Sequence, residues 1–182
     1  VRLGSFARAG AVMYCAQAYG CEAHQSIGFS MWPTFNPQGD VFLTAKPWAA
    51  SRAVSPGEVV LARSPSDPRN LIVKRVLATE GQQVRVDYGD NAGLRGAHSA
   101  AGFEDGAVVV VPKGHVWLLG DNVDHSNDSR AYGPVPRSLL RGRVVARIWP
   151  PLEAGWVHAH PMHQEFVVGR GDGGGDCCDA GE

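Results

Sequence analysis

The sequence predicts a mostly β domain built from antiparallel sheets. Two observations support this class: short apolar, β-branched runs recur from residue 40 onward, and turn residues separate them. The 182 residues include 23 glycines and 12 prolines, which favours many turns and argues against a helical bundle. Because strands and helices do not alternate regularly, we do not expect a parallel α/β sheet.

Seven strands are expected, and each is bounded by turn residues. Asn36-Pro37-Gln38-Gly39 precedes the first, Glu80-Gly81 separates the third from the fourth, and Pro150-Pro151 closes the last. The strands cover residues 40–45, 57–63, 71–79, 83–88, 107–111, 115–119 and 142–149. One short helix is expected over residues 138–141, and residues 89–106 form a loop rich in glycine and alanine.

The two ends of the chain differ from this central part. Residues 1–27 are expected to form a helical segment, as a membrane anchor, an interfacial helix or a packed soluble helix. No unbroken run of 18 apolar residues occurs there, so hydropathy alone does not decide between these. The folded domain is expected over residues 28–152, followed by an extension over 153–182. Within it, residues 169–182 are glycine-rich and acidic, which predicts disorder.

Composition excludes some functions. The formal net charge is −1, so there is no overall basic field that would attract nucleic acid. The four cysteines do not have the paired spacing of a zinc site, and no metal or other cofactor is expected.

Ser30 is the first residue with chemical interest. It lies in Gly28-Phe29-Ser30-Met31-Trp32-Pro33-Thr34, just after the apolar N-terminal segment. Because Pro33 restricts Trp32 to extended geometry, Ser30 is expected on a short, stiff, non-helical piece of chain. Taken alone, this segment is better explained by a serine in an ordinary turn.

Lys74 is one of only three lysines and lies in a largely apolar expected strand. In a strand it shares a face with Ile72, Val76 and Ala78, so its ammonium would be poorly solvated. Desolvation lowers the pKa of lysine, and a neutral amine can act as a general base. The alternative is an edge-strand lysine whose ammonium reaches water.

A polar loop follows the strand over 115–119. Residues 120–130 hold three Asp, two Asn, two Ser, one His and one Arg, enough for an internal hydrogen-bond network. A calcium loop is disfavoured because the glycine and glutamate of an EF-hand are missing. A Ser-His-Asp triad through His125 is a further alternative.

These three segments, in this order, resemble the motifs of type I signal peptidases, the serine–lysine endopeptidases that remove N-terminal targeting segments. The similarity covers about residues 20–150, and Gly39-Asp40-Val41 is also similar to a strand start of that family. Within the family the chain is similar to subunit 1 of the mitochondrial inner membrane proteases, as in Ser64-Pro65-Ser66-Asp67-Pro68. The implied fold is a set of antiparallel sheets forming a partly open barrel, with an N-terminal helical membrane anchor.

The resemblance also implies a role for each matching residue. Ser30 would be the nucleophile, Lys74 the general base, and Ser126 the residue that orients the Lys74 amine. Gly28 stands where some bacterial members carry a serine that stabilises the oxyanion. Ion pairs that fix the loop would join Arg75 to Asp121 and Asp128 to Arg130. Met31 and Pro33 would contact the substrate.

The implied partners are preproteins, inner membrane lipid and protease subunit 2, with the catalytic domain facing the mitochondrial intermembrane space. Three other functions compete with this interpretation. They are a repressor-type autoprotease, a catalytically silent subunit of a membrane protease complex, and a β-rich module that binds a cation through the acidic loop.

Overall fold

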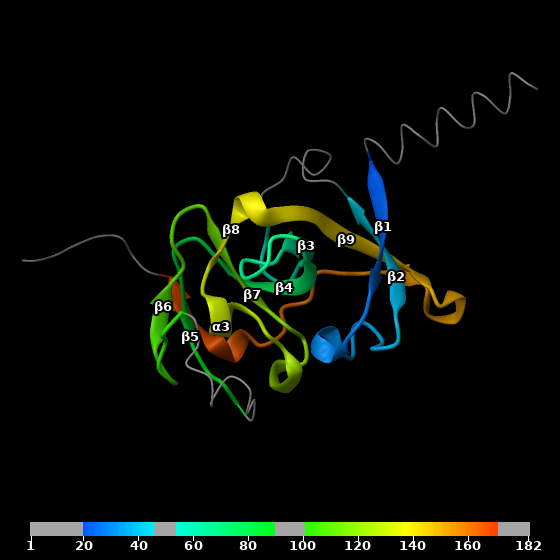
Figure 1. The fold of residues 1–182 in the computed structure, drawn as a ribbon. Coiled ribbons are helices and arrows are strands. Elements are labelled where there is room, and N and C mark those ends of the chain that lie inside the picture. The colour runs from blue at the N-terminus through cyan, green and yellow to red at the C-terminus, as the bar shows by residue number, and fades with distance from the viewer. Residues whose placement is uncertain (1–19, 46–53, 90–100, 171–182) are drawn as a thin grey trace, which may run out of the picture.

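The computed structural model describes residues 20–45, 54–89 and 101–170, which form antiparallel strands joined by short helices (Figure 1). Eight strands belong to one sheet. In spatial order its path is β1 (Cys21–Ser26), β2 (Asp40–Ala45), β9 (Leu140–Trp149), β3 (Val59–Arg63), β4 (Leu71–Thr79), β7 (His115–Leu119) and β8 (Val135–Pro136), while β10 (Gly155–Trp156) pairs with β9. The second sheet has the order β11 (Val167–Arg170), β5 (Gln82–Arg85) and β6 (Val108–Val110).

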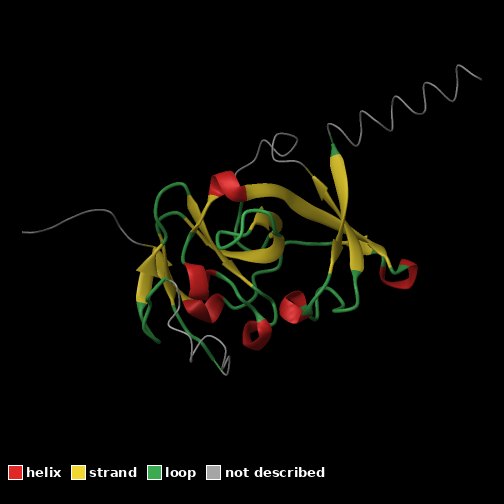
Figure 2. Ribbon diagram, viewed as in Figure 1, coloured by secondary structure: helices red, strands yellow, loops and turns green. Residues whose placement is uncertain are grey.

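The helices of the described residues are single turns between strands (Figure 2). They are η1 (Phe29–Met31), η2 (Val123–His125), α3 (Ser129–Tyr132), η3 (Arg137–Leu139), η4 (Pro151–Glu153) and η5 (Gln164–Phe166). Two of them matter for the site, because η1 carries Ser30 and α3 includes the end of the polar loop.

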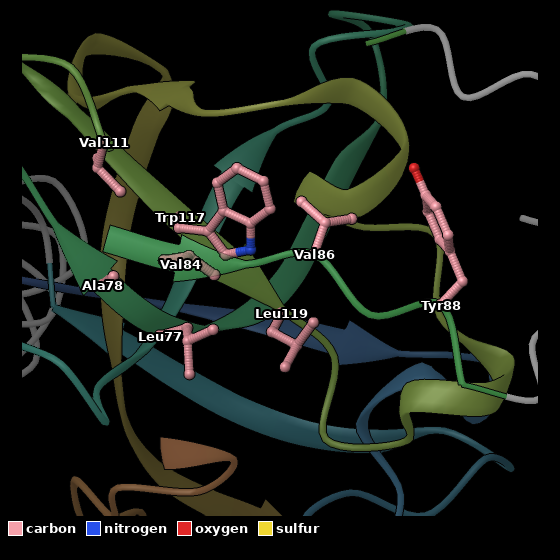
Figure 3. Packing of buried hydrophobic residues seen from close by; sticks show 8 residues of the cluster. All are labelled: Leu77, Ala78, Val84, Val86, Tyr88, Val111, Trp117 and Leu119. Carbon is pink, nitrogen blue, oxygen red and sulfur yellow. The ribbon is translucent and has the colours of Figure 1, made fainter. Parts of the chain in front are cut away.

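Buried apolar residues form three clusters around the strands. The first joins the two sheets, and Figure 3 shows Trp117 of β7 among residues of β4, β5 and the chain beyond β5. The second packs Met31 of η1 against Phe35, Phe42 and Val59, which anchors η1 to the large sheet. The third lies around Val76 and Leu118. The strand that carries Lys74 therefore contributes to two cores at once.

Most expected strands are present, and three of them, β2, β4 and β7, have the expected bounds. The mostly β, antiparallel fold class is confirmed. The helix expected over 138–141 is wrong: η3 ends at Leu139, and Leu140 already pairs with Ala62 as the start of β9. Strand pairing thus overrides the local helical preference.

The expectations for the two ends need correction. Residues 21–26 were expected to be helical, but they form β1, which pairs along its whole length with β2. Residues 169 and 170 were expected to be disordered, but they belong to β11 and pair with β5. Residues 1–19 and 171–182 lie outside the described part of the chain. Within the described part, no helix is long and apolar enough to span a membrane.

Candidate active site

Lys74 is buried in the middle of the large sheet. Its strand β4 lies between β3 and β7, and the residue is only 4% exposed, which excludes an edge-strand lysine that reaches water. Burial is the main cause that lowers the pKa of Lys74 from 10.5 to about 8. The carboxylates of Asp128 and Asp121 act in the opposite direction, and the Arg130 guanidinium adds to the lowering. The amine of Lys74 therefore loses its proton at a lower pH than an ordinary lysine does, and a fraction of it is neutral near pH 7.

Ser30 lies in the 3-10 turn η1, so the expectation of a non-helical piece of chain is wrong. The turn is short because Trp32, directly after it, is extended with φ −68° and ψ 139°, as expected for a residue before proline. Ser30 is half-buried, and its carbonyl accepts a hydrogen bond of 3.1 Å from the Asn122 N–H. That bond ties the serine to the polar loop.

Gly120 lies close to Ser30 and Ser126 and, in strand register, beside Lys74. In the register of β4 and β7, Arg75 lies opposite Leu119, so Lys74 lies level with Gly120 just beyond the last pair. A β-carbon at Gly120 would lie 2.6 Å from the Ser30 carbonyl oxygen and would overlap the Ser126 hydroxyl. Ser126 and the Ser30 carbonyl therefore crowd the space that a side chain at position 120 would fill, and Lys74 lies level with this glycine on the neighbouring strand.

Arg75, next to Lys74 in the chain, is held by a buried ion pair. Its Nε and Nη2 donate to the two oxygens of Asp121 at 2.7 Å each, and Nη1 donates to the Gly57 carbonyl at 2.7 Å. Thr34 joins the same group, because its hydroxyl donates to Asp121 and accepts from Arg75 at 3.1 Å. The group links the chain after Ser30, the strand of Lys74 and the start of the polar loop.

The second ion pair holds the inside of the polar loop. Arg130 donates to both Asp128 oxygens at 2.9 and 3.0 Å, and to the carbonyls of Val123 at 2.6 Å and Ser126 at 3.5 Å. Asp128 also accepts from the Gly120 N–H at 3.2 Å. Arg130 and Asp128 are both buried, so this network fixes the backbone on either side of Ser126.

The other candidates of the loop point elsewhere. Asp124 and His125 are exposed, while Asp128 is buried against Arg130, so the acidic positions of a calcium loop do not converge. Among residues 20–45, 54–89 and 101–170, no group of three or more His, Cys, Asp or Glu is placed to hold a metal ion.

The two residues expected to contact substrate lie in different environments. Met31 is buried in the second apolar cluster, whereas Pro33 is exposed. Sequence reasoning assigned no role to Thr34 or Gly120, although both lie inside the quoted motifs. Their role depends on contacts between segments far apart in the chain, which the motif spacing does not reveal.

Comparison with known proteins defines the class of this chain as a peptidase. The model of the family described as signal peptidase, peptidase S26, matches residues 3–149, and the chain belongs to this family. It is 42% identical over 125 residues to the mitochondrial ATP-independent inner membrane protease subunit 1a of Arabidopsis thaliana, covering 68% of each chain. It is 35% identical over 157 residues to the human mitochondrial inner membrane protease subunit 1, covering 86% of this chain and 87% of the relative.

A crystal structure of a signal peptidase I from Enterococcus faecalis is also similar, with a TM-score of 0.38 and 20% sequence identity. The match covers 50% of this chain and 97% of that chain.

Proposed function

We propose that this chain is a membrane-bound serine endopeptidase that removes N-terminal targeting segments from preproteins through a Ser30–Lys74 dyad. One observation supports the proposal most strongly: a buried lysine of lowered pKa lies level with the glycine that Ser30 and Ser126 also contact. A lysine amine can serve as a base only when burial makes its neutral form accessible, and this site provides that burial.

In the proposed reaction, the neutral Lys74 amine takes the proton of the Ser30 hydroxyl as its oxygen attacks the scissile carbonyl. The tetrahedral intermediate collapses, Lys74 gives the proton to the leaving amine, and an ester joins the substrate acyl group to Ser30. Lys74 then takes a proton from water, which attacks the ester. As the second tetrahedral intermediate collapses, the acid product leaves and Lys74 returns the proton to the Ser30 oxygen. Ser126, held by the Arg130 network, would keep the lysine amine aimed at Ser30.

The oxyanion would depend on main-chain donors near Ser30. Gly28 has φ 116° and ψ 166°, a conformation that other residues rarely adopt, so a serine side chain there would be strained. The Gly28 N–H itself donates to the Pro37 carbonyl at 3.1 Å. We therefore assign the oxyanion contact to the Ser30 N–H, supplemented by another main-chain group.

Two strand edges lead to the proposed dyad and could receive an extended substrate. In the described part of the chain, β7 pairs with β4 only from Arg75 onward, so the segment Leu71–Val73 has β3 as its one partner. β1, which leads into the Ser30 turn, is the edge strand of the large sheet. An extended segment added to such an edge gains main-chain hydrogen bonds without demanding one sequence.

We also propose that the site faces the lipid of the mitochondrial inner membrane from the intermembrane space. Ile27, Phe29 and Trp32, on either side of Ser30, are large apolar side chains that lie exposed. Exposed apolar groups that surround a site favour a lipid or protein contact. The subunit numbers in the relatives' names support assembly with a second subunit of such a protease, which we take to be subunit 2.

Cleavage of a preprotein in detergent tests this proposal, with wild type compared with Ser30→Ala and Lys74→Ala. Circular dichroism would establish that each variant is folded. We expect a single cut by wild type and none by either variant. If wild type does not cut even with the second subunit present, the chain is instead a catalytically silent subunit, and cutting by a folded Lys74→Ala variant would refute the dyad.

A further inference from the structure

The segment between β10 and β11 crosses the body of the molecule and joins the two sheets. In Figure 1 this orange segment runs from the side of β9 to the side of β5. It is attached at both ends: the Val157 N–H donates to the Val145 carbonyl at 2.9 Å, and Phe166 packs against the cluster around Trp117. We call residues 157–166 the C-terminal strap.

The strap contacts two main-chain carbonyls that lie beside the Arg75–Asp121 ion pair. The Gly57 carbonyl accepts from Arg75 and also from the His160 N–H of the strap, at 3.2 Å. On the other side, His163 Nε2 lies 3.2 Å from the Asp121 carbonyl oxygen. A carbonyl oxygen only accepts, so Nε2 carries the hydrogen in this contact.

The His163 side chain is packed among neighbouring groups and is not free on the surface. Only 21% of it is exposed, its ring lies 5.9 Å from that of Phe166, and its Nδ1 lies 3.3 Å from Glu165. Its backbone has φ 59°, in the left-handed region that is uncommon for residues other than glycine. The fold therefore keeps an unfavourable backbone conformation at the position that aims this ring at Asp121.

A single peptide group links the hydrogen bond from His163 to the hydrogen bond at Ser30. The carbonyl of Asp121 and the N–H of Asn122 belong to the same planar unit. The carbonyl accepts from His163, and the N–H donates to the Ser30 carbonyl at 3.1 Å. Successive hydrogen bonds across one peptide strengthen each other, so His163 restrains the plane that holds the proposed nucleophile.

We infer that His163 is a positioning residue for the proposed reaction: through the Asp121–Asn122 peptide it fixes the backbone of Ser30 against Lys74. The inference rests on the proposed function, since it assigns a task within that site. His163 touches neither the substrate nor the reacting atoms. Its loss should therefore lower kcat while leaving KM nearly unchanged, because the substrate-binding edges stay in place.

The test measures kcat and KM for cleavage of a preprotein by the full chain, with the second subunit where it is required. His163→Gly removes the ring and also suits φ 59°, so any loss cannot come from backbone strain. His163→Gln keeps an N–H donor at the same distance along the side chain. His158→Ala, an exposed histidine of the same strap, is the matched control.

We expect His163→Gly to lower kcat about three- to tenfold, the effect of one hydrogen bond to a positioned group, with KM within about twofold. His163→Gln should recover most of that loss, and His158→Ala should match wild type. Hydrogen exchange at the Asn122 amide should become faster in His163→Gly and return toward the wild-type rate in His163→Gln.

The inference is overturned if folded His163→Gly retains the wild-type kcat, or if His163→Gln is as slow as His163→Gly. A wild-type chain that does not cleave, or a Ser30→Ala variant that does, would instead overturn the proposed function. In that case an unchanged Asn122 exchange rate in His163→Gly would also overturn the hydrogen-bond path, and a faster one would support it without the catalytic role.

Discussion

The pH dependence of cleavage tests Lys74 as the base. Burial lowers its pKa from 10.5 to about 8, against the opposing effect of Asp128 and Asp121. Only the neutral amine can take the Ser30 proton, so the active fraction of enzyme is the deprotonated fraction of Lys74. For a pKa of about 8, that fraction is about 9% at pH 7, about 50% at pH 8 and about 90% at pH 9.

We therefore expect kcat/KM to rise about tenfold between pH 7 and pH 9, with a midpoint near 8. The assay would use a peptide substrate without groups that titrate in this range, in detergent at constant ionic strength. Because kcat/KM reports the free enzyme, the midpoint refers to Lys74 before substrate binds. Circular dichroism at each pH would show that the fold does not change over the range.

Two results would refute this reasoning. A flat profile from pH 7 to pH 9 would mean that no group with the pKa of Lys74 controls the reaction. Loss of cleavage in a folded His125→Ala variant, together with a profile that does not follow Lys74, would assign the base to His125 and favour a triad.

Three further predictions concern the same neighbourhood. Lys74→Met should abolish cleavage yet raise the free energy of unfolding by up to about 3 kcal/mol at pH 7, measured by thermal unfolding. Because the pKa of Lys74 is lower in the folded than in the unfolded chain, the lysine destabilises the fold fully below about pH 8, and the cost disappears as the pH rises to 10.5. Reduced stability of the variant would contradict this. Asp121→Asn should cost about 3–5 kcal/mol in urea unfolding, because Arg75 stays buried without a counter-charge, and a loss below about 1 kcal/mol would refute it. Gly120→Ala should lower kcat at least about tenfold by displacing Ser126, whereas Gly155→Ala, with open space at its β-carbon, should match wild type; equal rates would contradict the crowding.

The central strands could be predicted because their limits are local. Turn residues stand at both ends of β2, β4 and β7, and each run between them is apolar enough to form a core strand. β1 gave no such signal, since Cys21–Ser26 is a mostly polar edge strand whose only partner in the described residues is β2. Its strand conformation comes from that pairing, which a local pattern does not contain.

The residues of the site also separate into those that the sequence indicated and those that it did not. The resemblance to signal peptidases pointed to Ser30, Lys74 and Ser126, and the burial of Lys74 followed from the apolar face of its strand. His163 carried no signal, because it lies in a segment without periodicity and acts through the carbonyl of Asp121, 42 positions away. A contact between a side chain and a distant main-chain atom leaves no residue pattern at either end.

The adjacent cations Lys74 and Arg75 show how one strand separates chemistry from stability. Neighbouring residues of a strand point to opposite faces, so the two groups meet different surroundings. Arg75 receives a bidentate carboxylate from Asp121 and a carbonyl from Gly57, which suits a guanidinium that stays charged. Lys74 meets an environment in which burial outweighs the nearby carboxylates, which suits an amine that must lose its proton. Since Asp121 both neutralises Arg75 and opposes the lowering of the Lys74 pKa, the structural ion pair also helps to set the pH at which the proposed base becomes active.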